Sequence, residues 1–174
     1  MKMLTRLVLA ALLLTPAMAL AQAPKPTDAQ IAHIAYTAGA LDIAAGKQAL
    51  SKSDNADVKA FANQMVRDHQ AVNDKALALV KKLNVTPADN PTSQSLTKAA
   101  EVKRAELDKL SGSAFDRAYV ANEVAYHRTV NGALKDTLIP NAQNAELKSL
   151  LGTGLTLFTA HQEHAEHLAQ TLAK

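Results

Sequence analysis

The sequence predicts an all-α protein, folded as an up-down four-helix bundle. The chain is rich in alanine and contains only six glycines. Its apolar residues recur with the 3.6-residue period of amphipathic helices and do not alternate as they do in β-strands. Four main helices with three connections, the first and last of them short, favour antiparallel neighbours. We therefore expect one helical domain over residues 22–174.

The first two helices are predicted to form an antiparallel pair. Thr27-x-x-Gln30 is a capping box, from which the first helix is expected to run to about Leu50. After a tight connection at 51–54, Asp54 or Asn55 is expected to cap the second helix. Such a short loop requires the two helices to lie side by side.

The third helix is expected in two pieces, and the fourth completes the bundle. Residues 84–92 form a linker with two prolines, followed by a first piece over 93–110. Ser111-Gly112-Ser113 interrupts the pattern, and a second piece is expected from Ser113 until Pro140, which lacks an amide hydrogen, stops it. The last helix is predicted over about 142–172.

Residues 1–21 are predicted to be a secretory signal peptide. Lys2 and Arg6 precede an apolar run at 7–14, and small residues around Ala19 and Ala21 fit a cleavage site. This run is shorter than the ~20 residues that cross a bilayer, so we expect no transmembrane segment in the mature chain. Without cysteine there is neither a lipobox nor a disulfide. The expected location is the periplasm or the exterior.

Charge and motifs argue against several function classes. Without Lys2 and Arg6, the 19 Lys and Arg residues fall to 17, against 16 Asp and Glu. This balance provides no concentrated basic face for nucleic acid. The sequence has no Gly-x-Ser-x-Gly elbow, phosphate loop or dinucleotide fingerprint. We therefore favour a non-enzymatic role.

Titratable side chains stand inside the apolar stripes of all four main helices. An unpaired buried charge or imidazole costs several kcal/mol, so these groups must either satisfy one another or hold a metal ion. His164, one helical turn after His161 in the last helix, is a further candidate ligand, although it also fits an exposed face near a helix C-terminus. The candidate metal ligands are Asp42, His69, Glu123, His127, His161 and His164.

The depths of these residues limit a shared site. Counted from the bundle end expected to hold the first and last short loops, the five stripe residues span roughly 12 Å at ~1.5 Å per residue. Two or three of them are therefore expected to share a site near the middle of the bundle. Zinc, copper or iron is the candidate ion. Thioether-bound copper(I) is disfavoured, because Met65 is the only methionine outside the signal peptide.

Neighbouring side chains offer alternative partners for this group. Tyr119 and Tyr126 are plausible hydrogen-bond donors to Asp42, which would favour a structural network. Asp68 precedes His69 directly, but adjacent helical residues diverge by ~100° and cannot orient each other. We expect Asp68 to be exposed or at the rim, as a partner for Arg67, a lysine or the nearby backbone.

Several short motifs together are typical of one protein family. They are Met65-Val66-Arg67-Asp68-His69, Phe115-Asp116-x-x-Tyr119, Glu123, His127 and His161. With these motifs the chain resembles the domain of unknown function 4142 family of exported bacterial proteins, within the ferritin-like superfamily. The resemblance covers about residues 31–172 and implies a ferritin-like four-helix bundle, with no established activity.

The ferritin-like di-iron pattern is incomplete in this sequence. That pattern requires Glu-x-x-His on two helices, but Val66 and Phe158 stand three residues before His69 and His161. A di-iron oxidase is therefore disfavoured, and a histidine-rich site of a single ion fits better.

Two functions remain open at this point. One is a metal-binding or metal-sequestering bundle. The other is a non-enzymatic envelope or stress-response module that contacts a protein partner, with the buried polar residues as a structural network. Under the second reading, residues 84–110 are the expected contact surface. The sequence leaves the oligomeric state open.

Overall fold

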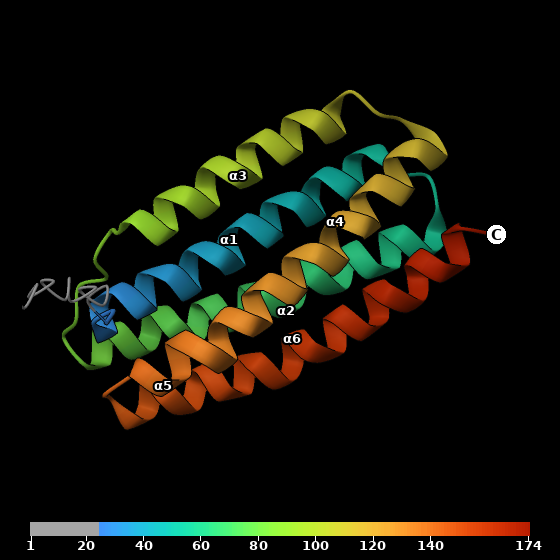
Figure 1. Cartoon of the computed structure of the whole chain (residues 1–174). Helices are drawn as coiled ribbons and strands as arrows, with labels where there is room; N and C mark the ends of the chain where they lie inside the picture. The colour runs from blue at the N-terminus through green and yellow to red at the C-terminus, as the bar shows by residue number, and fades with distance from the viewer. Residues whose placement is uncertain (1–24) are drawn as a thin grey trace, which may run out of the picture.

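The computed structural model describes residues 25–174, and this part of the chain is a helical bundle without strands (Figure 1). The predicted signal peptide, residues 1–21, lies outside the described residues. Among residues 25–174, no helix is both long and apolar enough to cross a membrane. The helices are α1 (Asp28–Lys52), α2 (Ala56–Lys82), α3 (Pro91–Asp108), α4 (Gly112–Ala133), the π-helical turn η1 (Leu134–Leu138), α5 (Ile139–Asn141) and α6 (Ala145–Leu172).

Local capping signals account for the helix starts. The predicted capping box at Thr27 is present, with the Thr27 hydroxyl accepting from the Gln30 amide at 3.3 Å. Asn55, Asn90 and Asn144 cap α2, α3 and α6 in the same manner, through side-chain oxygens that accept backbone N–H groups. The starts of α1, α2, α3 and α6 are therefore encoded locally, whereas Ser111 before α4 makes no side-chain cap hydrogen bond.

The order of the helices differs from the predicted up-down arrangement. In Figure 1, α1 and α6 run in one direction while α2, α4 and the turn that follows it run in the other. α3 does not continue into α4: it runs antiparallel to α4 and lies on the outer side of α1. It acts as a long crossover between α2 and α4, so the bundle core consists of α1, α2, α4 and α6.

The composition of α3 explains its outer position. Only Ser93 and Leu107 of its 18 residues are buried, so this helix lacks the apolar stripe that a core position requires. Its end is tied to α1, because Gln48 donates from Nε2 to the Arg104 carbonyl at 2.9 Å. Gly112, at a φ of 54°, then allows the sharp reversal into α4.

Pro140 does not stop the helix where we expected. After α4 the chain widens into the π-helical turn η1 and continues through α5 to Asn141. Pro140 stands in the first turn of α5, where its missing amide hydrogen costs little. The helix ends at Ala142, whose backbone is extended.

Two apolar clusters fill the bundle, one toward each end. The first surrounds Phe61, Met65 and Phe115 near the α1–α2 loop. The second surrounds Ile31 and Leu151 near the opposite end. These residues belong to the predicted apolar stripes, which are thereby confirmed as the core. The titratable residues lie between the two clusters.

Candidate metal centre

The five titratable residues of the stripes converge at one level of the bundle. Each is at most 3% exposed. Asp42 stands ten residues before the end of α1, Glu123 eleven after the start of α4, and His161 eleven before the end of α6. These three helix ends lie at the same end of the bundle (Figure 1).

The predicted spread of roughly 12 Å is therefore wrong. It assumed that the first and last loops share a bundle end, whereas the crossover through α3 places them at opposite ends. With the helix directions corrected, residues on α1, α4 and α6 come to similar depths. Because of this topology, more of the candidates meet than we expected.

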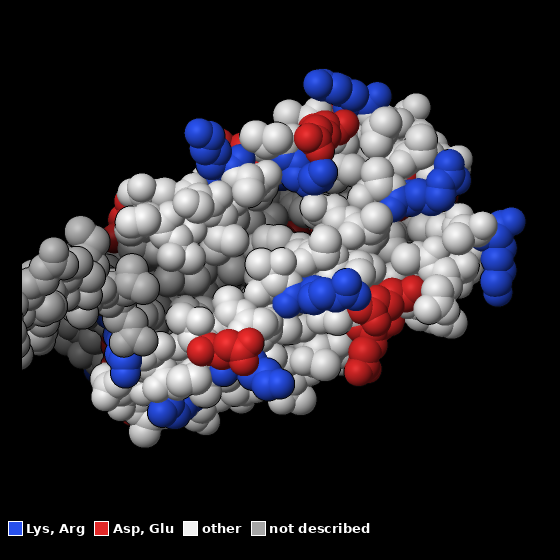
Figure 2. All heavy atoms as spheres, in the orientation of Figure 1, with Lys and Arg blue, Asp and Glu red and all other residues white. Residues whose placement is uncertain are grey.

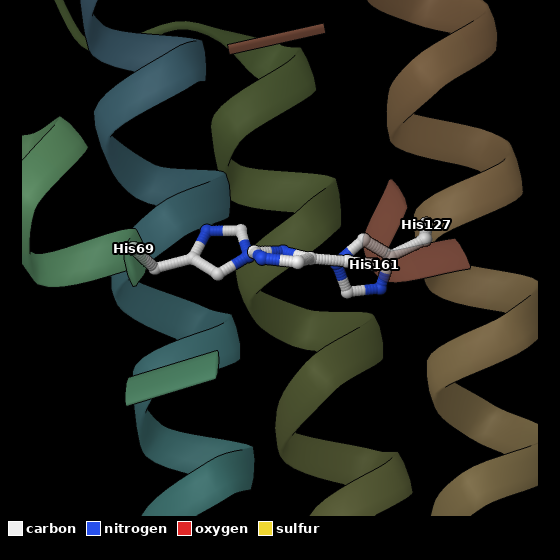
Figure 3. A group of neighbouring side chains, drawn as sticks. All are labelled: His69, His127 and His161. Atoms are coloured by element: carbon white, nitrogen blue, oxygen red, sulfur yellow. The ribbon is translucent and has the colours of Figure 1, made fainter. Parts of the chain in front are cut away.

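Three imidazoles form the centre of the group. Figure 3 shows the rings of His69, His127 and His161 meeting between α2, α4 and α6. One ring nitrogen from each lies within 4.8 Å of the other two. The Nε2 atoms of His69 and His127 are 3.4 Å apart. Such a cluster of nitrogens is the donor set that zinc and other transition ions use.

Two carboxyl groups border the imidazoles. Asp42 Oδ2 lies 2.5 Å from His69 Nε2 and 3.6 Å from His127 Nε2. Glu123 Oε2 lies 3.6 Å from His127 Nδ1. Asp42, Glu123 and His127 thus form a second group of mutually close donors, which shares His127 with the first.

A backbone contact fixes the tautomer of His127. Its Nδ1 lies 3.0 Å from the carbonyl oxygen of Glu123, one turn earlier in α4. A carbonyl can only accept a hydrogen bond, so Nδ1 carries the proton. In the neutral ring the lone pair is then on Nε2, which lies beside His69 and Asp42. This is how proteins commonly orient a histidine ligand.

Asp68 orients His161 in a similar way. Its Oδ2 accepts from His161 Nε2 at 3.1 Å, and its Oδ1 accepts from Arg67 Nε at 2.9 Å. The predicted pairing with Arg67 is confirmed, but sequence reasoning missed the contact with His161. When His161 is neutral, Nε2–H donates to Asp68 and the lone pair is left on the buried Nδ1, which has no other partner among the described residues.

The electrostatics keep two of the imidazoles neutral. Burial lowers the pKa of His127 against the smaller opposing effect of Asp42, and the neighbouring His69 lowers it further. Burial lowers the pKa of His161 to about 4, against the smaller opposing effect of Asp68. Near pH 7 both rings are therefore in the form that can bind a metal.

The two carboxyl groups behave differently from each other. Burial would raise the pKa of Asp42, but the adjacent His69 and His127 lower it to about 2. Burial and the charge of Asp42 together raise the pKa of Glu123 well above its ordinary value. Two close carboxyl groups rarely ionise together, so Asp42 carries the charge and Glu123 keeps its proton.

Hydrogen bonding within the chain leaves much of the group unsatisfied. Tyr126 donates to the Ala38 carbonyl at 2.8 Å, and the buried Tyr119 hydroxyl has no partner among the described residues. Neither tyrosine donates a hydrogen bond to Asp42, so the tyrosine donors that the sequence offered for Asp42 are not used in this way. His69 Nε2 lies 2.5 Å from Asp42 Oδ2, and this contact is one of the causes that lower the pKa of Asp42.

These orphaned atoms weigh against a purely structural network. A buried polar group without a partner costs about 1–3 kcal/mol. Among residues 25–174, the orphaned atoms of the group are His69 Nδ1 and His161 Nδ1. Asp42 and Glu123 have each other as partners, because protonated Glu123 can donate a hydrogen bond to the Asp42 carboxylate.

Two of the observed spacings fit a tetrahedral ion, whereas His161 is placed only within 4.8 Å of the other two imidazoles. Two ligands that each lie 2.0–2.1 Å from zinc are about 3.3 Å apart. The separations of 3.4 Å between His69 and His127 and 3.6 Å between His127 and Asp42 are close to this value. The 2.5 Å between His69 and Asp42 is too short, so metal entry would have to move Asp42 back by about 1 Å.

His164 lies apart from the other five candidates. It is exposed, donates from Nδ1 to Gln64 Oε1 at 3.1 Å, and packs its ring at right angles to that of Phe61. His161 and His164 are one turn apart, but only His161 turns into the bundle. The exposed-face interpretation of His164 therefore fits its position.

Comparison with known proteins gives a family and no activity. The model of a family described as a domain of unknown function (DUF4142) matches residues 13–168. This range includes the whole buried cluster and all five long helices except the last residues of α6. No curated protein and no solved structure matches the chain.

Proposed function

We propose that this chain, which belongs to the family described as a domain of unknown function (DUF4142), binds a single divalent metal ion at the centre of its bundle. The observation that carries the proposal is the group of three buried imidazoles with nitrogens within 4.8 Å of one another. His69, His127 and His161 are the nitrogen ligands and Asp42 supplies an oxygen. Glu123 lies beside this set as a protonated carboxyl group.

The ligand set favours zinc as the first candidate. Three imidazoles and one carboxylate are four donors, which match a closed tetrahedral zinc site. Copper(II) and iron(II) accept the same donor types and remain candidates. Only Asp42 and Glu123 among the five are carboxyl residues, which is too few for the four-carboxylate ferritin-like di-iron site. This supports binding or sequestration of an ion over oxygen chemistry.

We further propose a ferritin-like topology and export from the cytoplasm. A single long crossover, here through α3, is also what links the second and third core helices of ferritin-like bundles. The export proposal rests on the predicted signal peptide at residues 1–21. In this account the protein holds its ion in the periplasm or outside the cell.

A second function has specific support as well. The His69 ring stacks on Phe158 with centroids 4.3 Å apart, and it contacts Asp42 directly. Both contacts would also suit a structural network. α3 is largely exposed, with Val102 at 55% exposure, and fits the surface of an envelope or stress-response module that contacts another protein. Basic and acidic side chains are interspersed on the face in Figure 2, so charge does not single out a partner.

Calorimetric titration with zinc separates the two functions. The exported, processed protein is stripped of metal and titrated beside His161→Ala and His164→Ala. The metal proposal expects one zinc ion per chain, loss of binding in His161→Ala, and unchanged binding in the exposed control. A dissociation constant above ~10 μM, about 7 kcal/mol of affinity, in the unaltered protein would favour the structural network.

A further inference from the structure

A large apolar cavity occupies the half of the bundle in which α1, α3 and α6 begin. Its volume is about 850 Å³, within the roughly 300–1,000 Å³ range of small-molecule sites. Aliphatic side chains from α1, α2, α4 and α6 form most of its wall. Examples are Ala35, Val72, Val130 and Leu151.

The cavity extends from these helix starts to the middle of the bundle. Its lining runs from Thr27, which caps α1, to Gly39 twelve residues later, and from Leu147 to Phe158, eleven residues later on α6. At about 1.5 Å per residue the cavity is roughly 16–18 Å long. A straight hydrocarbon of about 12 carbons with its head group spans this length, because each C–C bond advances the chain by about 1.3 Å.

The polar side chains at the inner end of the cavity are bound or covered by the bundle. Tyr126 and Asn73 each donate to a backbone carbonyl of α1, at 2.8 and 3.3 Å. The ring nitrogens of His127 lie against the Glu123 carbonyl and His69 Nε2. Nδ1 of His69 is buried and has no surface toward the cavity. The inner end therefore suits the methyl end of a hydrocarbon chain.

The outer end carries the positive charge. Lys25 is exposed and is the only Lys or Arg that lines the cavity among residues 25–174, where neither Asp nor Glu lines it. No ion pair in this part of the chain includes Lys25. The nearby Asp28 carboxylate is occupied, because it accepts from the Gln143 and Asn144 amides at 2.8 Å. The N-termini of α1, α3 and α6 meet at this end (Figure 1), and each adds roughly half a positive charge.

We propose that the cavity binds a single-chain amphiphile of about 12 carbons, with an anionic head group beside Lys25 and its hydrocarbon chain along the apolar wall. The charge at the opening favours a carboxylate or a phosphate over a cationic head group. The apolar wall and the covered inner end favour an unbranched chain without further polar groups. This inference goes beyond the proposed function and does not depend on a metal ion.

The test measures the binding of single-chain probes by calorimetry to the exported, processed protein, at low salt and in chelator. Dodecanoate and dodecyl phosphate carry the two anionic head groups, dodecylamine is the cationic counterpart, and octanoate has the shorter chain. Ala35→Phe and Ala76→Phe fill the cavity wall, and exposed Ala105→Phe is their control. Lys25→Glu reverses the charge at the opening, and exposed Lys47→Glu is its control. Circular dichroism reports whether each variant is folded.

We expect dodecanoate to bind at least about tenfold more tightly than octanoate, because four more methylenes are buried. The tighter-binding of the two anions identifies the head group and should bind about fivefold more tightly than dodecylamine. Lys25→Glu should remove this preference and Lys47→Glu should keep it. Ala35→Phe or Ala76→Phe, when folded, should weaken binding by about tenfold, whereas Ala105→Phe should leave it unchanged.

Three results would overturn the inference. They are no binding of either anion, equal binding of dodecanoate and octanoate, and a head-group preference that Lys25→Glu leaves unchanged. Because every titration contains chelator, none of these results bears on the proposed metal site, and failure of the protein to bind zinc would leave the expected binding of the amphiphile the same.

Discussion

Asp42→Asn in the metal-free protein should lower the free energy of unfolding by about 2 kcal/mol at pH 7. The pKa of Asp42 is about 2 in the folded chain, against 3.8 for the free side chain. Each tenfold change in proton affinity corresponds to 1.36 kcal/mol, so the ionised carboxylate beside His69 and His127 contributes about 2 kcal/mol. Asparagine keeps the shape and removes the charge.

The pH dependence has a definite sign. A carboxyl group with a depressed pKa stabilises the fold above its unfolded pKa, and this stability is lost as the pH falls from about 4 toward 2. At pH 3 the difference between the two proteins should therefore shrink to about 1 kcal/mol. Guanidinium denaturation in chelator at both pH values measures it, with exposed Asp54→Asn as the control. An equal stability at pH 7, or a difference that persists at pH 2, would refute the assignment of charge to Asp42.

Three further predictions concern the same centre. Asp68→Asn should weaken zinc binding by roughly 10- to 100-fold, since residues that orient a ligand have effects of this size. Calorimetry checks it with the exposed Asp54→Asn as control, and an equal loss in that control would show that surface charge is responsible. Because the pKa of His161 is lowered to about 4, zinc should stay bound to this ligand at pH 5.5. NMR spectra of the His161 ring measure this, and dissociation of the ring from zinc already at pH 6.5 would contradict it. Glu123→Gln should raise the stability of the metal-free protein above about pH 4.5. A carboxyl group with a raised pKa stabilises the fold only below its unfolded pKa, and that stability is lost as pH rises. Thermal unfolding from pH 4 to 8 should show a flatter dependence of stability on pH in the variant, and an unchanged dependence would show that Glu123 does not hold the proton.

Helix starts and burial could be predicted from the sequence, because both depend on local spacing. The Thr27 capping box and the apolar stripes are features of a few consecutive turns. The inward position of Asp42, His69, Glu123, His127 and His161 follows from the same periodicity. Helical spacing from core residues placed these five side chains toward the core, but it did not decide the case of His164, which is three residues after His161 and exposed.

The direction of the helices could not be predicted in this way. The weak apolar stripe of α3 indicates an outer helix, but nothing within α3 states that it lies against α1 or that the chain reverses before α4. Because the position of α3 was unknown, the predicted depths of the five titratable residues along the bundle were wrong. The His161–Asp68 contact was missed for the same reason, because it requires α6 to lie beside α2. Pro140 was misjudged because a π-helical turn moves it into a first turn that tolerates proline.

Native mass spectrometry of the exported, processed protein after addition of one equivalent of zinc tests the central claim most directly. The metal-centre account predicts one zinc ion per chain, retained in His164→Ala and lost in His127→Ala, with both variants folded by circular dichroism. His127 is the decisive residue because it belongs to both groups of close donors. Zinc retained in His127→Ala, or no zinc held by the unaltered protein, would contradict the account.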